Sequence, residues 1–254
     1  QDLRWELDLL ELKRLLGLAT WKPIWEQEDF DSNSVLENES LQRSSADCEK
    51  VLTEVLGPDK GPMKILFLPD DSGGFLIDIL VLRSLIRQGH KIIVALKEGF
   101  FFYAPTFWDH EQDSVLSSAL EGAQFLTERQ LSKNELLKAQ RENDLLIISD
   151  GTREKLNLYR TSVTFARAWK EADLILAKGE ANHKRLIRNS HEFTRDVLCF
   201  YREKDFKLLL SYKPKSENAY KFTEEQLLAK SEAIINQMRQ AKRDAKNVMF
   251  YSAI

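Results

Sequence analysis

The sequence predicts an α/β fold: a three-layer α/β/α domain with a mostly parallel sheet, preceded by a short helical N-terminal region. Three observations predict it. After residue 64, short apolar runs of strand length alternate with amphipathic segments of helix length. Several of these runs are continuously apolar, which is typical of strands that helices cover on both faces. Polar turns rich in Gly and Asp separate the runs from the segments that follow them.

The first 60 residues predict a helical appendage to this domain. A leucine stripe recurs with helical spacing over residues 3–16, and Gly17 is a plausible stop for this first helix. Residues 20–45 are acidic and rich in Ser and Asn, so they predict a loop or linker. A second short helix is predicted over residues 46–56, before a Gly-Pro pair.

Seven strands and the helices between them are predicted after the appendage. The strands are apolar runs at residues 65–68, 91–96, 123–126, 145–149, 174–177, 197–201 and 207–211. The helices have apolar residues at helical spacing and cover residues 75–88, 114–120, 132–141, 161–171 and 182–188. Ser132 with Glu135, and Thr223 with Gln226, match the capping-box pattern. The second pair begins a long polar helix that runs to residue 246 or so.

Length and composition limit the number of domains, the kinds of partner and the location that we expect. The chain has 254 residues, and we divide it into an appendage at 1–60 and the α/β domain with its C-terminal helix at 61–254. The formal net charge of -3 predicts no general affinity for nucleic acid, and no apolar run is long enough to span a bilayer. Cys48 and Cys199 lie far apart and match no metal or disulfide pattern, so we expect a cytoplasmic location.

Residues 64–87 contain the turn around which the rest of the chain is organised. A buried strand is followed by Asp-Asp-Ser-Gly-Gly and then by a helix from about Phe75. Asp70 and Asp71 therefore stand at the carboxyl end of a strand, where open α/β sheets bind ligands. They would repel a bare phosphate, whereas a divalent cation between the carboxylates and the phosphate removes the conflict. The alternative is a turn without a ligand, in which Asp71 or Ser72 caps the helix.

Polar groups also follow the other predicted strands. If the sheet is parallel, these groups share one edge with the Asp70 turn, and Lys178 could neutralise a phosphate there as a point charge. Asn182 could instead cap the helix that begins beside it. The other interpretation is that these residues form the solvated loops expected at any such edge. The strand-end groups are Lys97 and Glu98, Asp150 and Thr152, Lys178 with Glu180 and Asn182, and Arg202 with Lys204.

Two segments together resemble the metal-dependent damage-control phosphatases, a family that also contains proteins once proposed as acidic-residue methyltransferases. The first is DDSGGFLID, from Asp70 to Asp78, and the second is ADLILAKGEANHKRL, from Ala172 to Leu186. The resemblance spans residues 64–211. It implies a three-layer α/β domain and a divalent metal, which would be Mn, Mg, Co or Ni. It also implies hydrolysis of phosphate esters, with a small phosphorylated metabolite such as a sugar phosphate as partner.

The resemblance also implies roles for individual residues. Asp70 and Asp71 are the implied metal ligands and, together with Lys178, the implied catalytic residues. Backbone N–H groups at the start of the helix would hold phosphate oxygens, and either Asp150 or Glu180 would orient a substrate hydroxyl or a water. The implied substrate-binding or phosphate-binding residues are Ser72, Gly73, Gly74, Asp78, Asp150, Glu180, Asn182 and Arg202.

Three positions depart from the family's pattern. Asp71 stands where the family has Asn, and Ala104 stands where it has a third metal-binding Asp. The run from Arg202 to Asp205 replaces a phosphate-binding Arg-Thr-x-Lys signature. Two hypotheses follow from these changes. The chain is a metal-dependent phosphatase with an altered ligand set, or it is a non-catalytic domain that binds a ligand or a protein partner.

Overall fold

The computed structural model describes residues 2–22, 24, 44–202, 207–221 and 223–251. Their contacts form two compact units, Gln1–Ala219 and Tyr220–Ile254. Because α1 (Asp2–Ala19) and α5 (Cys48–Leu56) belong to the first unit together with the sheet, these units differ from the division at residue 60, which stays a prediction. Most of the loop predicted at residues 20–45 lies outside the described residues.

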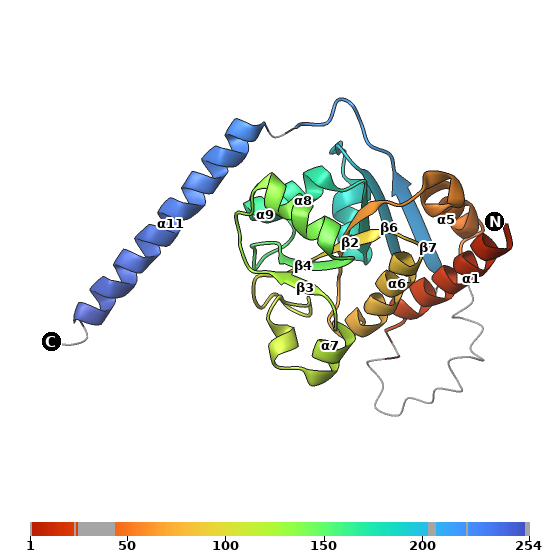
Figure 1. The fold of residues 1–254 in the computed structure, drawn as a ribbon, viewed down its shortest axis with the longest axis horizontal. Coiled ribbons are helices and arrows are strands. Elements are labelled where there is room, and N and C mark those ends of the chain that lie inside the picture. Colours follow the sequence, from red (N-terminus) through yellow and green to blue (C-terminus); the bar gives the residue numbers. More distant parts are fainter. Residues whose placement is uncertain (1, 23, 25–43, 203–206, 222, 252–254) are drawn as a thin grey trace. The chain divides into compact units, whose positions relative to one another are not determined.

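Seven strands form one sheet in the order β3-β4-β2-β1-β5-β6-β7 (Figure 1). All neighbouring strands pair in parallel except β7, which runs antiparallel to β6. The predicted mostly parallel sheet is confirmed, and β1 is its middle strand. The bounds are β1 Lys64–Leu68, β2 Lys91–Leu96, β3 Gln124–Leu126, β4 Leu145–Ser149, β5 Leu174–Lys178, β6 Asp196–Arg202 and β7 Leu208–Lys213.

Helices cover both faces of the sheet, which explains why its strands are apolar throughout. Phe67 of β1 packs in one core with Leu12 of α1, whereas Leu66 packs in a second core with Phe165 of α9. Successive side chains of a strand point to opposite faces, so β1 is buried on both sides. The other α-helices of this unit are α6 Phe75–Arg87, α7 Ser114–Ala119, α8 Lys133–Glu142, α9 Val163–Glu171 and α10 Glu180–His183. The unit also contains the short 3₁₀ helices η1 Pro58–Lys60 and η2 Asp109–Glu111, and the π-helix η3 Lys184–Arg188.

Both predicted capping boxes are present. At α8 the Ser132 hydroxyl accepts from the N–H of Glu135, and the Glu135 carboxylate accepts in return from the N–H of Ser132. Thr223 and Gln226 exchange the equivalent two bonds at the start of α11 (Glu224–Tyr251), which lies in the second unit. None of the described helices combines the length and the hydropathy that a membrane span requires.

The predicted end of the first helix is wrong. α1 continues through Gly17 to Ala19. Leu16 and Ala19 are both buried in the core that α1 shares with the sheet. Burial of these side chains outweighs the modest cost of glycine inside a helix, which is about 1 kcal/mol relative to alanine.

Candidate active site

The turn from Asp70 to Gly74 joins the middle strand to α6. Gly74 is the N-cap residue of α6, and in the described part of the chain no side chain caps that helix. The Asp71 carboxylate instead accepts a hydrogen bond from the N–H of Gly73 at 2.7 Å, which closes the turn before the helix begins. The alternative in which Asp71 or Ser72 caps the helix is therefore wrong. The N–H of Gly73, one of the groups predicted to hold phosphate, already donates to Asp71 in this bond.

A cavity of about 640 Å³ opens beside this turn, at the carboxyl end of the sheet. Asp70 and Asp71 lie on its wall next to Gly179, which follows the neighbouring strand β5. A Cβ atom on Gly179 would stand 2.0 Å from the Asp70 carboxylate, so glycine is the residue that leaves room for it. The cations on the wall are Lys22, Lys155, Lys178, Lys184, Arg185 and Arg202.

The electrostatics of Asp70 fit a metal ligand. Burial raises the pKa of its carboxyl, Lys178 opposes that shift, and the nearby Asp71 carboxylate adds to it. Two carboxylates on the wall of one partly buried site repel each other, and a cation between them removes the repulsion. Mg²⁺-like ions are commonly held by one or two carboxylates together with water and substrate phosphates. The donor set of Asp70 and Asp71 therefore fits a divalent cation.

The segment that carries Ala104 reaches the same turn. The N–H of Ser72 donates a hydrogen bond to the carbonyl of Tyr103 at 2.7 Å, so the next residue, Ala104, stands close to the turn. Its methyl group offers no oxygen ligand. Within the residues that the structure describes, no group of three or more His, Cys, Asp or Glu side chains is placed to hold an ion. The side chains at this turn that could hold a cation are consequently the two carboxylates of Asp70 and Asp71.

Lys178 and Asp78 form a buried ion pair behind the cavity wall. The ammonium nitrogen lies 2.8 Å and 3.0 Å from the two carboxylate oxygens of Asp78. The side chains of Lys178 and Asp78 are 4% and 0% exposed. Burial raises the pKa of Asp78 to about 7, although Lys178 opposes the shift. Of this pair, Lys178 reaches the cavity, and Asp78 holds it in place.

Asn182 and Glu180 both belong to α10, the short helix that follows Gly179. Asn182 lies inside this helix, and its side-chain amide donates to the carbonyl of Lys178 at 2.8 Å. The alternative in which Asn182 caps the helix is therefore wrong. Glu180 is exposed on the cavity wall and pairs with Lys184 at 2.7 Å, one turn further along.

Arg202 connects the cavity wall to the end of α1. Its guanidinium donates to the carbonyl of Gly17 at 2.9 Å and to the Thr20 hydroxyl at 3.3 Å. It also lies 5.4 Å from the centre of the Trp21 ring, a cation–π contact. Carbonyls at a helix C-terminus attract cations. Arg202 therefore anchors α1 beside the cavity, while residues 203–206, which contain most of the altered phosphate signature, lie outside the described residues.

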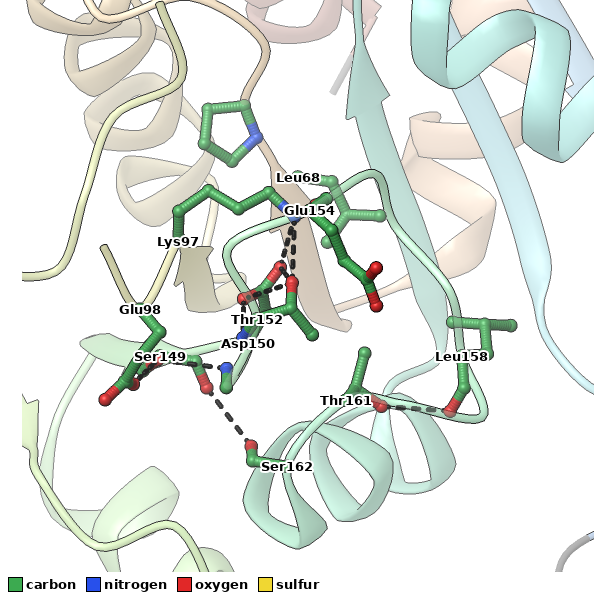
Figure 2. Close-up of polar contacts among 12 residues, drawn as sticks. Leu68, Lys97, Glu98, Ser149, Asp150, Thr152, Glu154, Leu158, Thr161 and Ser162 are labelled. Atoms are coloured by element: carbon green, nitrogen blue, oxygen red, sulfur yellow. Dashed lines mark hydrogen bonds and ion pairs between the residues drawn. The ribbon is translucent and has the colours of Figure 1, made fainter. Parts of the chain in front are cut away.

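A second buried pair, Lys97 with Asp150, stands at the ends of β2 and β4 (Figure 2). The Lys97 ammonium donates to Asp150 at 2.6 Å, to the Thr152 hydroxyl at 3.2 Å and to the carbonyl of Glu154 at 2.7 Å. Asp150 is predicted to orient a hydroxyl or a water, but the structure places it in this pair, outside the described lining of the cavity. The sequence signal for the pair is weak: both residues follow strands that prove to be neighbours.

Four cations of the cavity wall have no place in the predicted site, and one of them, Lys184, pairs with Glu180. Arg185 is half-buried in η3, which directly follows α10, and burial lowers its pKa while Asp70 opposes the shift. Lys22 follows α1, and Lys155 follows β4 by six residues. The spacing of Arg185 from Asn182 on one helical segment could have suggested it. Lys22 and Lys155 come from loops whose course the sequence pattern does not indicate.

A family model described as the damage-control phosphatase ARMT1-like domain matches residues 16–206. The chain belongs to this family. The match includes both segments on which the resemblance rested. A solved structure of a DUF89 family protein from Pyrococcus horikoshii is 20% identical in sequence, with 80% of this chain and 67% of that chain covered and a TM-score of 0.48. No curated protein gives a significant match.

Proposed function

We propose that this damage-control phosphatase domain hydrolyses small phosphate esters, such as sugar phosphates, with a divalent cation held by Asp70 and Asp71. One observation supports the proposal most: the wall of one cavity contains both carboxylates and six Lys or Arg side chains. Its volume of about 640 Å³ lies in the usual range for small-molecule sites. Membership of the phosphatase family supports the reaction class and leaves the substrate open.

The residues of the cavity have different roles in the proposed hydrolysis. A divalent cation, when bound, supplies Lewis-acid stabilisation of the phosphoryl oxygens. Lys178, held in place by Asp78, is available at the cavity wall to donate a hydrogen bond to a phosphoryl oxygen. Arg185 and Lys22 lie close enough to affect the pKa of Asp70, so they are placed to bind phosphoryl oxygens. Glu180, on the wall of the cavity, is placed to accept a hydrogen bond from a substrate hydroxyl.

The position of Ala104 favours a second candidate function. A phosphatase of this family with one ligand fewer would hold its cation less tightly, because fewer groups replace the ion's water. The same cavity would still bind a phosphorylated ligand through its cations. The second candidate is therefore a domain that binds such a ligand without hydrolysing it.

A phosphatase screen with Mg²⁺, Mn²⁺, Co²⁺ and Ni²⁺ across sugar phosphates separates the two candidates. We expect the wild type to release phosphate with at least one metal and Asp70→Asn to fall to background. Asp59→Asn, an exposed aspartate in η1, is the matched control and should keep full activity. Equal inactivity of the wild type and Asp70→Asn with every metal would contradict hydrolysis, and retained binding of the sugar phosphates would then favour the second candidate.

A further inference from the structure

We infer that the preferred substrate carries a second anionic group besides its phosphate, and that Lys155 binds this group. The substrate class is then a phosphorylated carboxylic acid or a bisphosphate. This inference rests on the proposed function, because it concerns the far end of the same substrate. It follows from the charges on the cavity wall and from the way the loop that carries Lys155 is held.

The cavity holds more positive charge than a simple phosphate ester needs. Two of its lysines are neutralised by close carboxylates, whereas Lys22, Lys155 and Arg185 have no hydrogen bond or ion pair within the described part of the chain. A divalent cation would offset Asp70 and Asp71. Arg202, the remaining cation of the wall, is held by the Gly17 carbonyl and the Thr20 hydroxyl. The other three positive charges then face a phosphate dianion, so at least one charge remains for another anion. The neutralised lysines are Lys178, paired with Asp78, and Lys184, paired with Glu180.

The three remaining cations, Lys22, Lys155 and Arg185, are carried by different elements around Asp70. Arg185 follows β5, which is next to β1, and Lys22 follows α1, whose last turn is bound by Arg202 at the end of β6 on the same side of β1. These two therefore belong to the phosphoryl end of the cavity. Lys155 follows β4, which lies two strands from β1 on the side away from β5. Its charge consequently serves the end of the substrate that is distant from the phosphate.

The buried Lys97–Asp150 pair fixes the backbone immediately before Lys155 (Figure 2). The Lys97 ammonium donates to the carbonyl of Glu154, the residue that directly precedes Lys155. Two residues before Glu154, the carbonyl of Thr152 accepts the N–H of Glu98 at 3.0 Å. An ordered backbone lowers the entropic cost of holding a ligand with the exposed side chain that follows it. Lys97 and Asp150 are thus positioning residues for Lys155.

Two open-chain compounds test the inference, because they differ only at carbon 1. These are 6-phosphogluconate, which has a carboxylate there, and sorbitol 6-phosphate, which has a hydroxymethyl group. Calorimetric titration with Mn²⁺ present should show 6-phosphogluconate binding about tenfold more tightly, as expected for one added charge-assisted hydrogen bond. Lys155→Met, an exposed substitution that should leave the fold intact, should abolish this preference. Lys60→Met, an exposed lysine in η1, should keep it.

Equal binding of the two compounds, absence of binding, or a preference that survives in Lys155→Met would overturn the inference. Lys97→Met adds a test of the positioning role: it should reduce the preference and leave the affinity for sorbitol 6-phosphate at the wild-type value. Phosphate release is measured separately on both compounds. A preference without release supports this inference and contradicts the proposed hydrolysis, whereas release without a preference does the reverse.

Discussion

Two buried lysine–aspartate pairs stand at the same edge of the sheet, and their surroundings differ. In the Lys178–Asp78 pair both carboxylate oxygens face one ammonium group, and the pair joins β5 to α6. The Lys97 side chain is more exposed, at 14% against 4% for Lys178, and it also donates to two loop residues. The first pair links a strand to a helix beside the cavity. The second holds a loop, so the same chemistry fixes the core in one place and a surface segment in another.

Removal of the carboxylate from the core pair should have the largest effect on stability. Asp78→Ala leaves a buried ammonium without this partner, which costs about 3–5 kcal/mol. Urea denaturation measures the free energy of unfolding. The double variant Asp78→Leu with Lys178→Met should recover a large part of the loss, because it removes both charges. If the double variant is as unstable as the single one, lost packing rather than an unpaired charge explains the cost.

Removal of the carboxylate from the loop pair should cost less. In Asp150→Ala the Lys97 ammonium keeps two acceptors and some access to water, so we expect a loss of about 1–3 kcal/mol. The loop beyond residue 150 should also become easier to cleave, and limited trypsin digestion at Arg153 and Lys155 measures this. A loss as large as that of Asp78→Ala, without faster cleavage, would show that the two pairs do not differ in the way described.

The pH dependence of stability should report on the core pair. Burial raises the pKa of Asp78 from 3.8 to about 7, so the folded state keeps this proton to a higher pH than the unfolded state. Its contribution to stability is complete below 3.8 and is lost as the pH rises through about 7. The urea midpoint of the wild type should therefore fall over this interval, and Asp78→Asn should fall less. An unchanged pH slope in Asp78→Asn would contradict this assignment.

Most of the fold was predictable from the sequence because its signals are local. The seven apolar runs and both capping boxes depend only on neighbouring residues. The end of the apolar run at 65–68 likewise predicts that the Asp70 turn follows a buried strand. The partners of the charged residues were not predictable. Lys178 and Asp78 are 100 residues apart, and Arg202 is 185 residues from the Gly17 carbonyl that it binds. Such contacts depend on the strand order and on how α1 packs, which local patterns do not encode.

Calorimetric Mn²⁺ titration tests directly whether Asp70 and Asp71 hold a divalent cation, the claim on which the proposed hydrolysis depends most. The wild type should bind one Mn²⁺ per chain. Asp70→Asn and Asp71→Ala should each weaken binding by more than about tenfold, since even the hydrogen-bond partners of metal ligands are worth that much. Asp59→Asn should bind as the wild type does. Wild-type affinity in Asp70→Asn would contradict the claim, because the cation would then be held elsewhere on the chain.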